Sequence, residues 1–67
     1  MNKPFRIIVV TGRKRRWLRD WRGDVMRFET GEHAHEVADS FQFLALSRPE
    51  FEIFTVVEIG QVARMAA

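Results

Sequence analysis

The chain contains no cysteine, only two prolines and no long apolar run. Without cysteine it can form neither a disulfide bond nor a thiolate metal site. The apolar run from Ile7 to Val10 is far too short to cross a bilayer, which takes about 20 residues. The first residues also lack the apolar stretch of a signal peptide. These absences predict a cytoplasmic protein with no membrane contact.

The residue patterns that support catalysis are missing as well. No Gly-rich phosphate loop is present, and no serine nucleophile has a base in view. His33 and His35 are the only histidines. Two residues apart on a helix, they point in nearly opposite directions and cannot hold one metal ion together. We therefore expect a non-enzymatic protein that uses no metal and no cofactor.

Size and composition predict one small folded domain. The chain has 67 residues, of which 46% are apolar and 30% charged, as in globular domains and unlike disordered segments. A chain of this size buries only about 60% of its unfolded surface, so its stability is marginal. A homodimer is therefore as compatible with the sequence as a well-packed monomer.

What the chain does have is an uneven distribution of charge. Residues 1–22 carry a formal charge of +7 and residues 23–67 carry −5, which together give the net charge of +2. Both tryptophans, Trp17 and Trp21, lie in the basic part. A basic segment that also contains aromatic residues predicts an anionic partner for one end of the molecule.

The first half of the chain has the features of strands. Residues 5–11 are rich in β-branched side chains on both faces, which is typical of a central strand. Gly23 and Asp24 form a tight-turn signal, so we expect a hairpin with strands near 15–22 and 25–30. A short helix over 14–22 is an alternative, because Trp17 and Trp21 are four residues apart.

The second half predicts a helix and one more strand. The helix should begin after Thr30, whose hydroxyl can cap the first turn, and end before Pro49. Its apolar stripe consists of Ala34, Val37, Ala38, Phe41, Leu44 and Ala45. Residues 51–59 then form a strongly apolar strand. Residues 61–67 are either a frayed tail or a half-turn lying on the domain.

These elements predict a single α+β domain, residues 1–67, with the order β-β-β-α-β. One helix would pack on a four-stranded mixed sheet with the strand order 3-2-1-4. The chain would pass through two hairpins and one helical crossover between the two central strands, 5–11 and 51–59. These strands would therefore be parallel neighbours.

Alternation along the strands assigns the two faces of this sheet. The face toward the helix would hold Phe5, Ile7, Val9, Leu18, Met26, Phe28, Phe51, Ile53, Val57 and Ile59. The other face would gather Arg6, Ile8, Val10, Trp17, Arg19, Trp21, Val25, Arg27, Phe54 and Val56. Reversing the second strand would bury Arg19 without a partner, at a high cost in free energy.

The second face combines arginines, which pair with phosphates, with flat rings on which bases stack. The sequence thus predicts a nucleic-acid-binding protein. Its candidate contact residues are Arg13, Lys14, Arg15, Arg16, Trp17, Arg19, Trp21 and Arg27.

A different class of function is compatible with the same residues. The chain could be a small regulatory protein that docks this face on a larger protein, such as part of the transcription machinery. Docking or self-association could also use Phe43 and Leu46, which lie on the helix away from the apolar stripe. These two side chains are either covered by the tail or offered to a partner.

Overall fold

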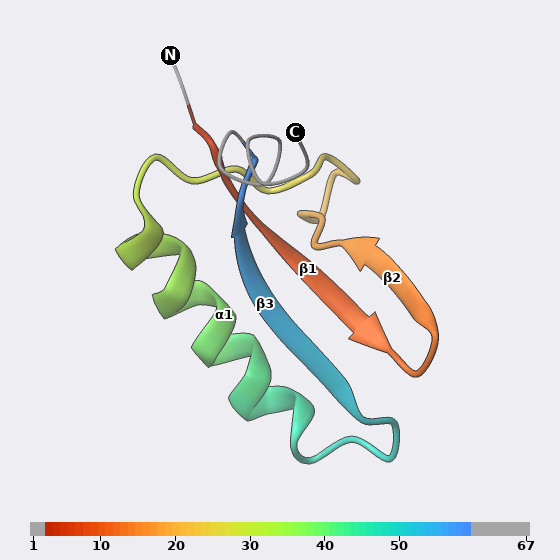
Figure 1. Ribbon diagram of the computed structural model, residues 1–67. Helices are drawn as coiled ribbons and strands as arrows, with labels where there is room; N and C mark the ends of the chain where they lie inside the picture. The colour runs from red at the N-terminus through yellow and green to blue at the C-terminus, as the bar shows by residue number, and fades with distance from the viewer. Residues whose placement is uncertain (1–2, 60–67) are drawn as a thin grey trace.

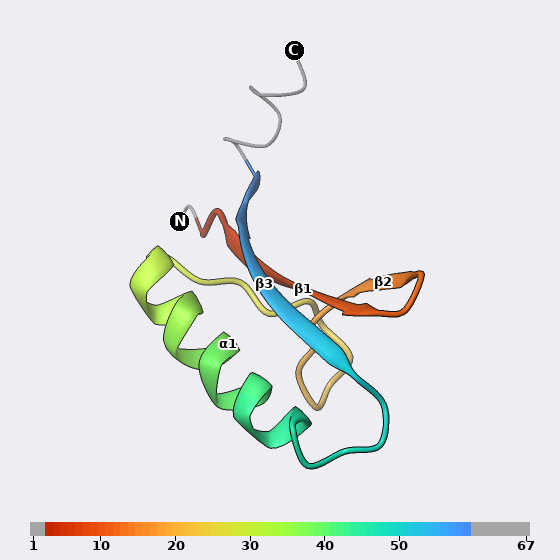
Figure 2. The ribbon, with the colours of Figure 1, turned by 60° about the horizontal axis from the view of Figure 1, so that its bottom comes forward.

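The central strand of the sheet is β1, Phe5–Thr11, and the other elements are arranged around it. The structure is a computed structural model that describes residues 3–59. After β1 come β2 (Lys14–Trp17), α1 (Gly31–Ala45) and β3 (Glu52–Glu58). Both β2 and β3 pair with β1 in antiparallel orientation, which gives the sheet order β2-β1-β3. Figures 1 and 2 show α1 running alongside β3, with β2 on the far side of β1 from the helix.

The strand β1 owes its central place to apolar residues on both of its faces. Ile7 and Val9 are fully buried, while Ile8 and Val10 on the opposite face are half-buried. The strand ends at a two-residue turn in which Gly12 has φ of +60°, a backbone conformation that glycine adopts without steric cost. The predicted strand 5–11 and its central position are confirmed.

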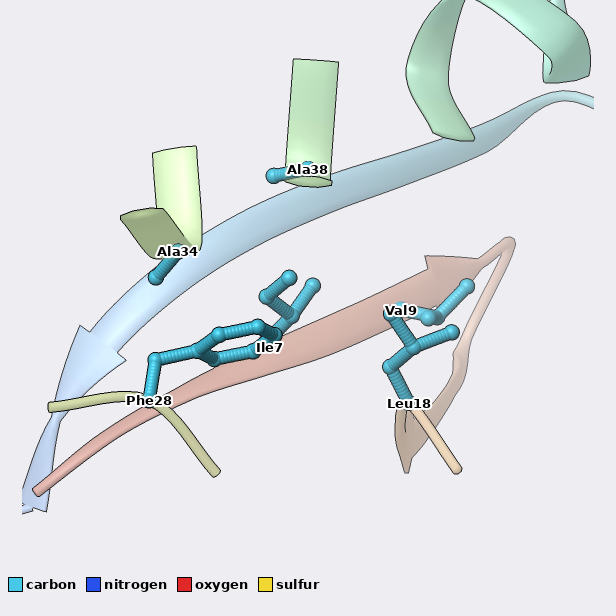
Figure 3. Packing of buried hydrophobic residues seen from close by; sticks show 6 residues of the cluster. All are labelled: Ile7, Val9, Leu18, Phe28, Ala34 and Ala38. Atoms are coloured by element: carbon cyan, nitrogen blue, oxygen red, sulfur yellow. The ribbon is translucent and has the colours of Figure 1, made fainter. Parts of the chain in front are cut away.

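The hydrophobic core lies between β1 and α1. Figure 3 shows Ile7 and Val9 of β1 together with Leu18, Phe28 and two helix residues, Ala34 and Ala38. The alanines are small, so α1 can approach the sheet closely. Burying an isoleucine or valine side chain stabilises the fold by about 1.5–3 kcal/mol, and both β1 residues have no exposed surface.

The helix begins where the sequence predicts. The Thr30 hydroxyl accepts a hydrogen bond from the backbone N–H of His33 at 3.2 Å, which satisfies one of the free donors of the first turn. The helix ends at Ala45, several residues before Pro49. Leu44 was expected in the core stripe, but it is 56% exposed, because it lies at the border of the stripe near the end of the helix. Residues 61–67, the predicted tail, lie outside the described residues.

The predicted four-stranded sheet is wrong, because residues 25–30 do not form a strand. The chain does reverse at Gly23, but only one bridge, between Arg19 and Val25, follows the turn. Phe28 then pairs with Phe5 of β1, with N–H to O distances of 3.1 and 2.9 Å. The short β2 leaves this end of β1 without a partner, and Phe28 satisfies the backbone groups there. Residues 20–27 therefore form a loop that leaves the edge of β1 and returns to it at Phe28.

The predicted parallel pair is also wrong in direction. The strands 5–11 and 52–58 do lie side by side, with Ile7 opposite Val56 and Val9 opposite Phe54, but they are antiparallel. The expected third strand would have added one more chain reversal. Without that strand, the helix returns the chain so that β3 runs opposite to β1.

The side-chain orientation of β3 differs from the predicted one. Phe54 and Val56 face the core, whereas Ile53 is 44% exposed and Phe51, before the strand, is 70% exposed. Both alternate sets of this strand contain large apolar side chains, so alternation alone does not choose between them. Packing against the helix determines which set faces the core, because Phe41 stacks on Phe54 with ring centroids 5.7 Å apart.

Candidate nucleic-acid interface

Within residues 3–59, no helix or strand covers the side of the sheet that faces away from α1. Ile8 lies between two buried neighbours in β1 and therefore points away from the helix. Residues opposite each other in the ladder share a face, so Trp17 and Thr55 flank Ile8 on that side. The same register extends this surface, which we call the open face, to the following residues: Arg6, Ile8, Val10, Arg15, Trp17, Ile53, Thr55 and Val57.

The open face is apolar at its centre and basic toward its ends. Ile8 and Val10 form the middle row, and Trp17 lies beside Ile8. Arg6 and Arg15 are the only charged members of the set, and both are basic. The sequence predicted Arg6, Ile8, Val10 and Trp17 on this face. Ile53 and Val57 take the places expected for Phe54 and Val56.

Trp17 borders a distinct hollow in this surface. The hollow has a volume of about 210 Å3 and is lined by Ile8, Arg15, Arg16 and Trp17. Trp17 is half-buried, so part of its side chain packs on the protein and part stays accessible. Arg15 shares this face, whereas Arg16 alternates with it and binds Glu52 on the other face. An aromatic side chain with an isoleucine and an arginine beside it can accept a flat, electron-rich ring.

The β1–β2 turn supplies the main concentration of positive charge. Arg13, Lys14, Arg15 and Arg16 are all exposed there. Arg16 is nevertheless engaged: its Nη2 lies 3.1 Å from Oε2 of Glu52, and Arg48 binds the other carboxylate oxygen at 3.1 Å. Glu52 is 8% exposed, so this pair of arginines compensates a buried negative charge. The sequence carried no signal for this role of Arg16.

Trp21 does not share the open face with Trp17. It lies in the loop 20–24 and is 87% exposed, with the guanidinium carbon of Arg22 4.8 Å from its ring centroid. Asp20 shapes this loop, because its Oδ1 accepts from the N–H groups of Arg22 and Asp24 at 2.8 and 3.0 Å. The structure therefore separates the two tryptophans that the sequence placed together.

Arg19 and Arg27 are placed away from the β1–β2 turn. The Nη1 of Arg19 donates to the carbonyl of Gly23 at 2.7 Å, across the loop. A shallow groove beside this loop is lined by Lys3, Arg19, Asp20, Asp24, Val25, Met26 and Arg27. Two carboxylates lie among its three basic groups, so the groove is far less positive than the β1–β2 turn.

No protein-family model, curated protein or solved structure matches this chain.

Charge of opposite sign lies on the helix side of the molecule. The helix α1 carries Glu32, Glu36 and Asp39 and contains no lysine or arginine. Figure 1 shows α1 and β2 on opposite sides of β1 and β3, so the acidic and basic segments are separated in space. The charge division seen along the sequence is therefore preserved in the fold.

Phe43 and Leu46 are solvent-exposed, at 75% and 67%. Leu44 and Phe51, both expected in the core, are exposed as well, at 56% and 70%. The end of α1 and the α1–β3 connection therefore carry an apolar surface, which we call the helix-end patch: Phe43, Leu44, Leu46 and Phe51.

The histidines take no part in a metal site in the described part of the chain. His33 packs its ring edge-on against Phe28, with centroids 5.1 Å apart. Among residues 3–59, no group of three His, Asp or Glu side chains comes together as a metal site requires. Over the same residues, no helix is long and apolar enough to span a membrane.

Proposed function

We propose that this protein binds nucleic acid through the open face and the adjoining β1–β2 turn. The observation that carries the proposal is the composition of that face, which offers an accessible tryptophan and two arginines and includes no acidic residue. Arg13 and Lys14 extend the positive charge at one end. Arginine binds phosphate with paired hydrogen bonds, and aromatic rings stack on bases.

The proposal includes no chemical step. The protein would act as a binding module without a cofactor, and we propose a cytoplasmic location, with which the absence of cysteine is compatible. A further role of the basic residues is compatible with this function. Charged side chains on an edge strand such as β2 also prevent pairing with a second sheet.

The dependence of binding on salt tests the proposal. We expect labelled oligonucleotides to bind at low salt, with affinity falling as the logarithm of salt concentration at a slope of about −0.7 to −0.9 per phosphate contact. Replacing Arg13 and Lys14 together with glutamine should make the slope shallower by about two contacts. The matched control is Arg22→Gln, which removes one charge from the loop 20–24. If no oligonucleotide binds at low salt, the nucleic-acid proposal is wrong, and docking of this face on a larger protein becomes the favoured hypothesis.

A second candidate function is self-association through the helix-end patch. Its four large apolar side chains are each more than half exposed. Four large exposed apolar side chains between positions 43 and 51 favour an interaction site in this part of the chain. None of the four residues is charged, so two copies of the chain can meet here without like-charge repulsion.

A further inference from the structure

We propose that the open face takes a single strand of nucleic acid and seats one base against Trp17. This inference rests on the proposed function and specifies its ligand. The starting point is the hollow lined by Ile8, Arg15, Arg16 and Trp17, because the half-buried Trp17 and the exposed Arg15 share its face of the sheet.

The apolar centre of the open face favours single strands over duplexes. In a duplex the faces of the bases are stacked on one another, and the outer surface presents mainly phosphates and base edges. Phosphates laid against Ile8 and Val10 would lose water without gaining a partner. An unpaired base, in contrast, has a free π-face that can cover this apolar surface and stack on Trp17.

Along the direction of β1, the open face carries an arginine on either side of Trp17. Arg6 and Val10 are four residues apart in β1, a distance of about 13 Å at the rise of a β-strand. Arg15 lies beside Val10, and Trp17 lies beside Ile8, midway between the two ends. A nucleic-acid strand running along β1 would therefore meet an arginine, then the aromatic ring, then a second arginine. The two arginines can contact phosphates on either side of the stacked base, more than one nucleotide apart.

The two tryptophans differ in how far the structure prepares them for stacking. Trp17 is half-buried beside Ile8, so its ring loses little freedom when a base binds. Trp21 is 87% exposed in a loop outside the open face, and Arg22 covers its ring. Trp21 therefore provides a matched control of the same residue type in the same chain.

The experiment uses a mixed-sequence strand of 20 nucleotides and the duplex formed with its complement. In the Trp21→Phe protein, Trp17 is the only fluorophore, and we expect the single strand to quench its emission and the duplex to leave it unchanged. Trp17→Leu should weaken single-strand binding about 5- to 150-fold, the range found for losing one stacked base, while Trp21→Leu should not. The Leu side chain keeps the sheet covered, and thermal melting checks that the variant is folded.

Arg15→Gln provides a second variant, because Arg15 is exposed and its replacement leaves the fold intact. It should make the salt slope of single-strand binding shallower by about 0.7. Equal affinity for strand and duplex, with no quenching of Trp17, would overturn this inference and leave the proposed function standing. Absence of binding to either ligand at low salt would overturn both.

Discussion

Arg16 and Glu52 join the two edge strands of the sheet across the intervening β1, with Nη2 and Oε2 3.1 Å apart. Arg16 belongs to the basic turn that faces solvent, and Glu52 is the one buried charged residue in the described part of the chain. One arginine of the candidate interface thus serves the fold, whereas its neighbour Arg15 points to the open face and has no such bond in the structure.

The first prediction separates these two neighbouring arginines. Arg16→Gln should lower the stability by about 0.5–1 kcal/mol, because Arg16 is half-exposed and solvent screens its ion pair. A loss of this size lowers Tm by about 2–8 °C in a domain of this length. Arg15→Gln should leave Tm unchanged and weaken oligonucleotide binding more than Arg16→Gln does. Thermal melts and binding titrations of both variants measure this, and the reverse ranking would contradict the assignment.

The second prediction concerns Gln42, which protects the free edge of β3. Its Nε2 donates to the carbonyl of Glu52 at 2.6 Å, and its Oε1 accepts from the N–H of Phe54 at 2.9 Å, so the side chain binds β3 as a neighbouring strand would. Gln42→Ala should cost about 1–3 kcal/mol, because two partly buried backbone groups lose their partners.

Gln42→Ala should also aggregate more readily, because the edge of β3 becomes available for pairing. Urea unfolding and light scattering measure the two effects. The control is Ser40→Ala on the same helix, which removes one exposed hydrogen bond, to the carbonyl of Glu36. If the two variants behave alike, the edge of β3 does not depend on Gln42.

The third prediction tests the helix-end patch. Phe43→Ser should abolish self-association and leave Tm nearly unchanged, because Phe43 is 75% exposed and its truncation opens no cavity. Sedimentation and thermal melting measure the two effects. Trp21→Ser removes an equally exposed aromatic side chain outside the patch and should change neither.

An unchanged sedimentation profile of Phe43→Ser would remove the self-association hypothesis. A clear fall in its Tm would show instead that Phe43 is covered within the monomer. Truncation of a well-buried phenylalanine costs about 3–5 kcal/mol, which is easily measured.

The strand and helix positions follow from local patterns and could be predicted. The β-branched run of β1, the turn at Gly12 and the cap at Thr30 each depend on neighbouring residues in the sequence, and all three are confirmed. The topology depends on distant pairings. Phe28 pairs with Phe5 because β2 leaves that end of β1 without a partner. The alternation of apolar and polar residues does not indicate which part of β1 is unpaired, so it could not distinguish this pairing from a continued hairpin.

The candidate site could be predicted only in part for the same reason. Trp17 could be assigned to the open face because the reverse orientation of its strand would bury Arg19 without a partner. Arg6 was assigned there because it alternates with Ile7 in the sequence. In β3 both alternate sets contain large apolar side chains, and the choice rests on the stacking of Phe41 on Phe54 and on the burial of Glu52. Trp21 was misplaced because Asp20 turns the chain into a loop through bonds that strand periodicity does not reveal.

The separation of the acidic helix from the basic β1–β2 turn makes this small molecule an electric dipole. Near a polyanion, the field exerts a torque that swings the turn toward the polymer and α1 away from it before any contact forms. Neighbouring copies bound along one strand would all direct α1 outward.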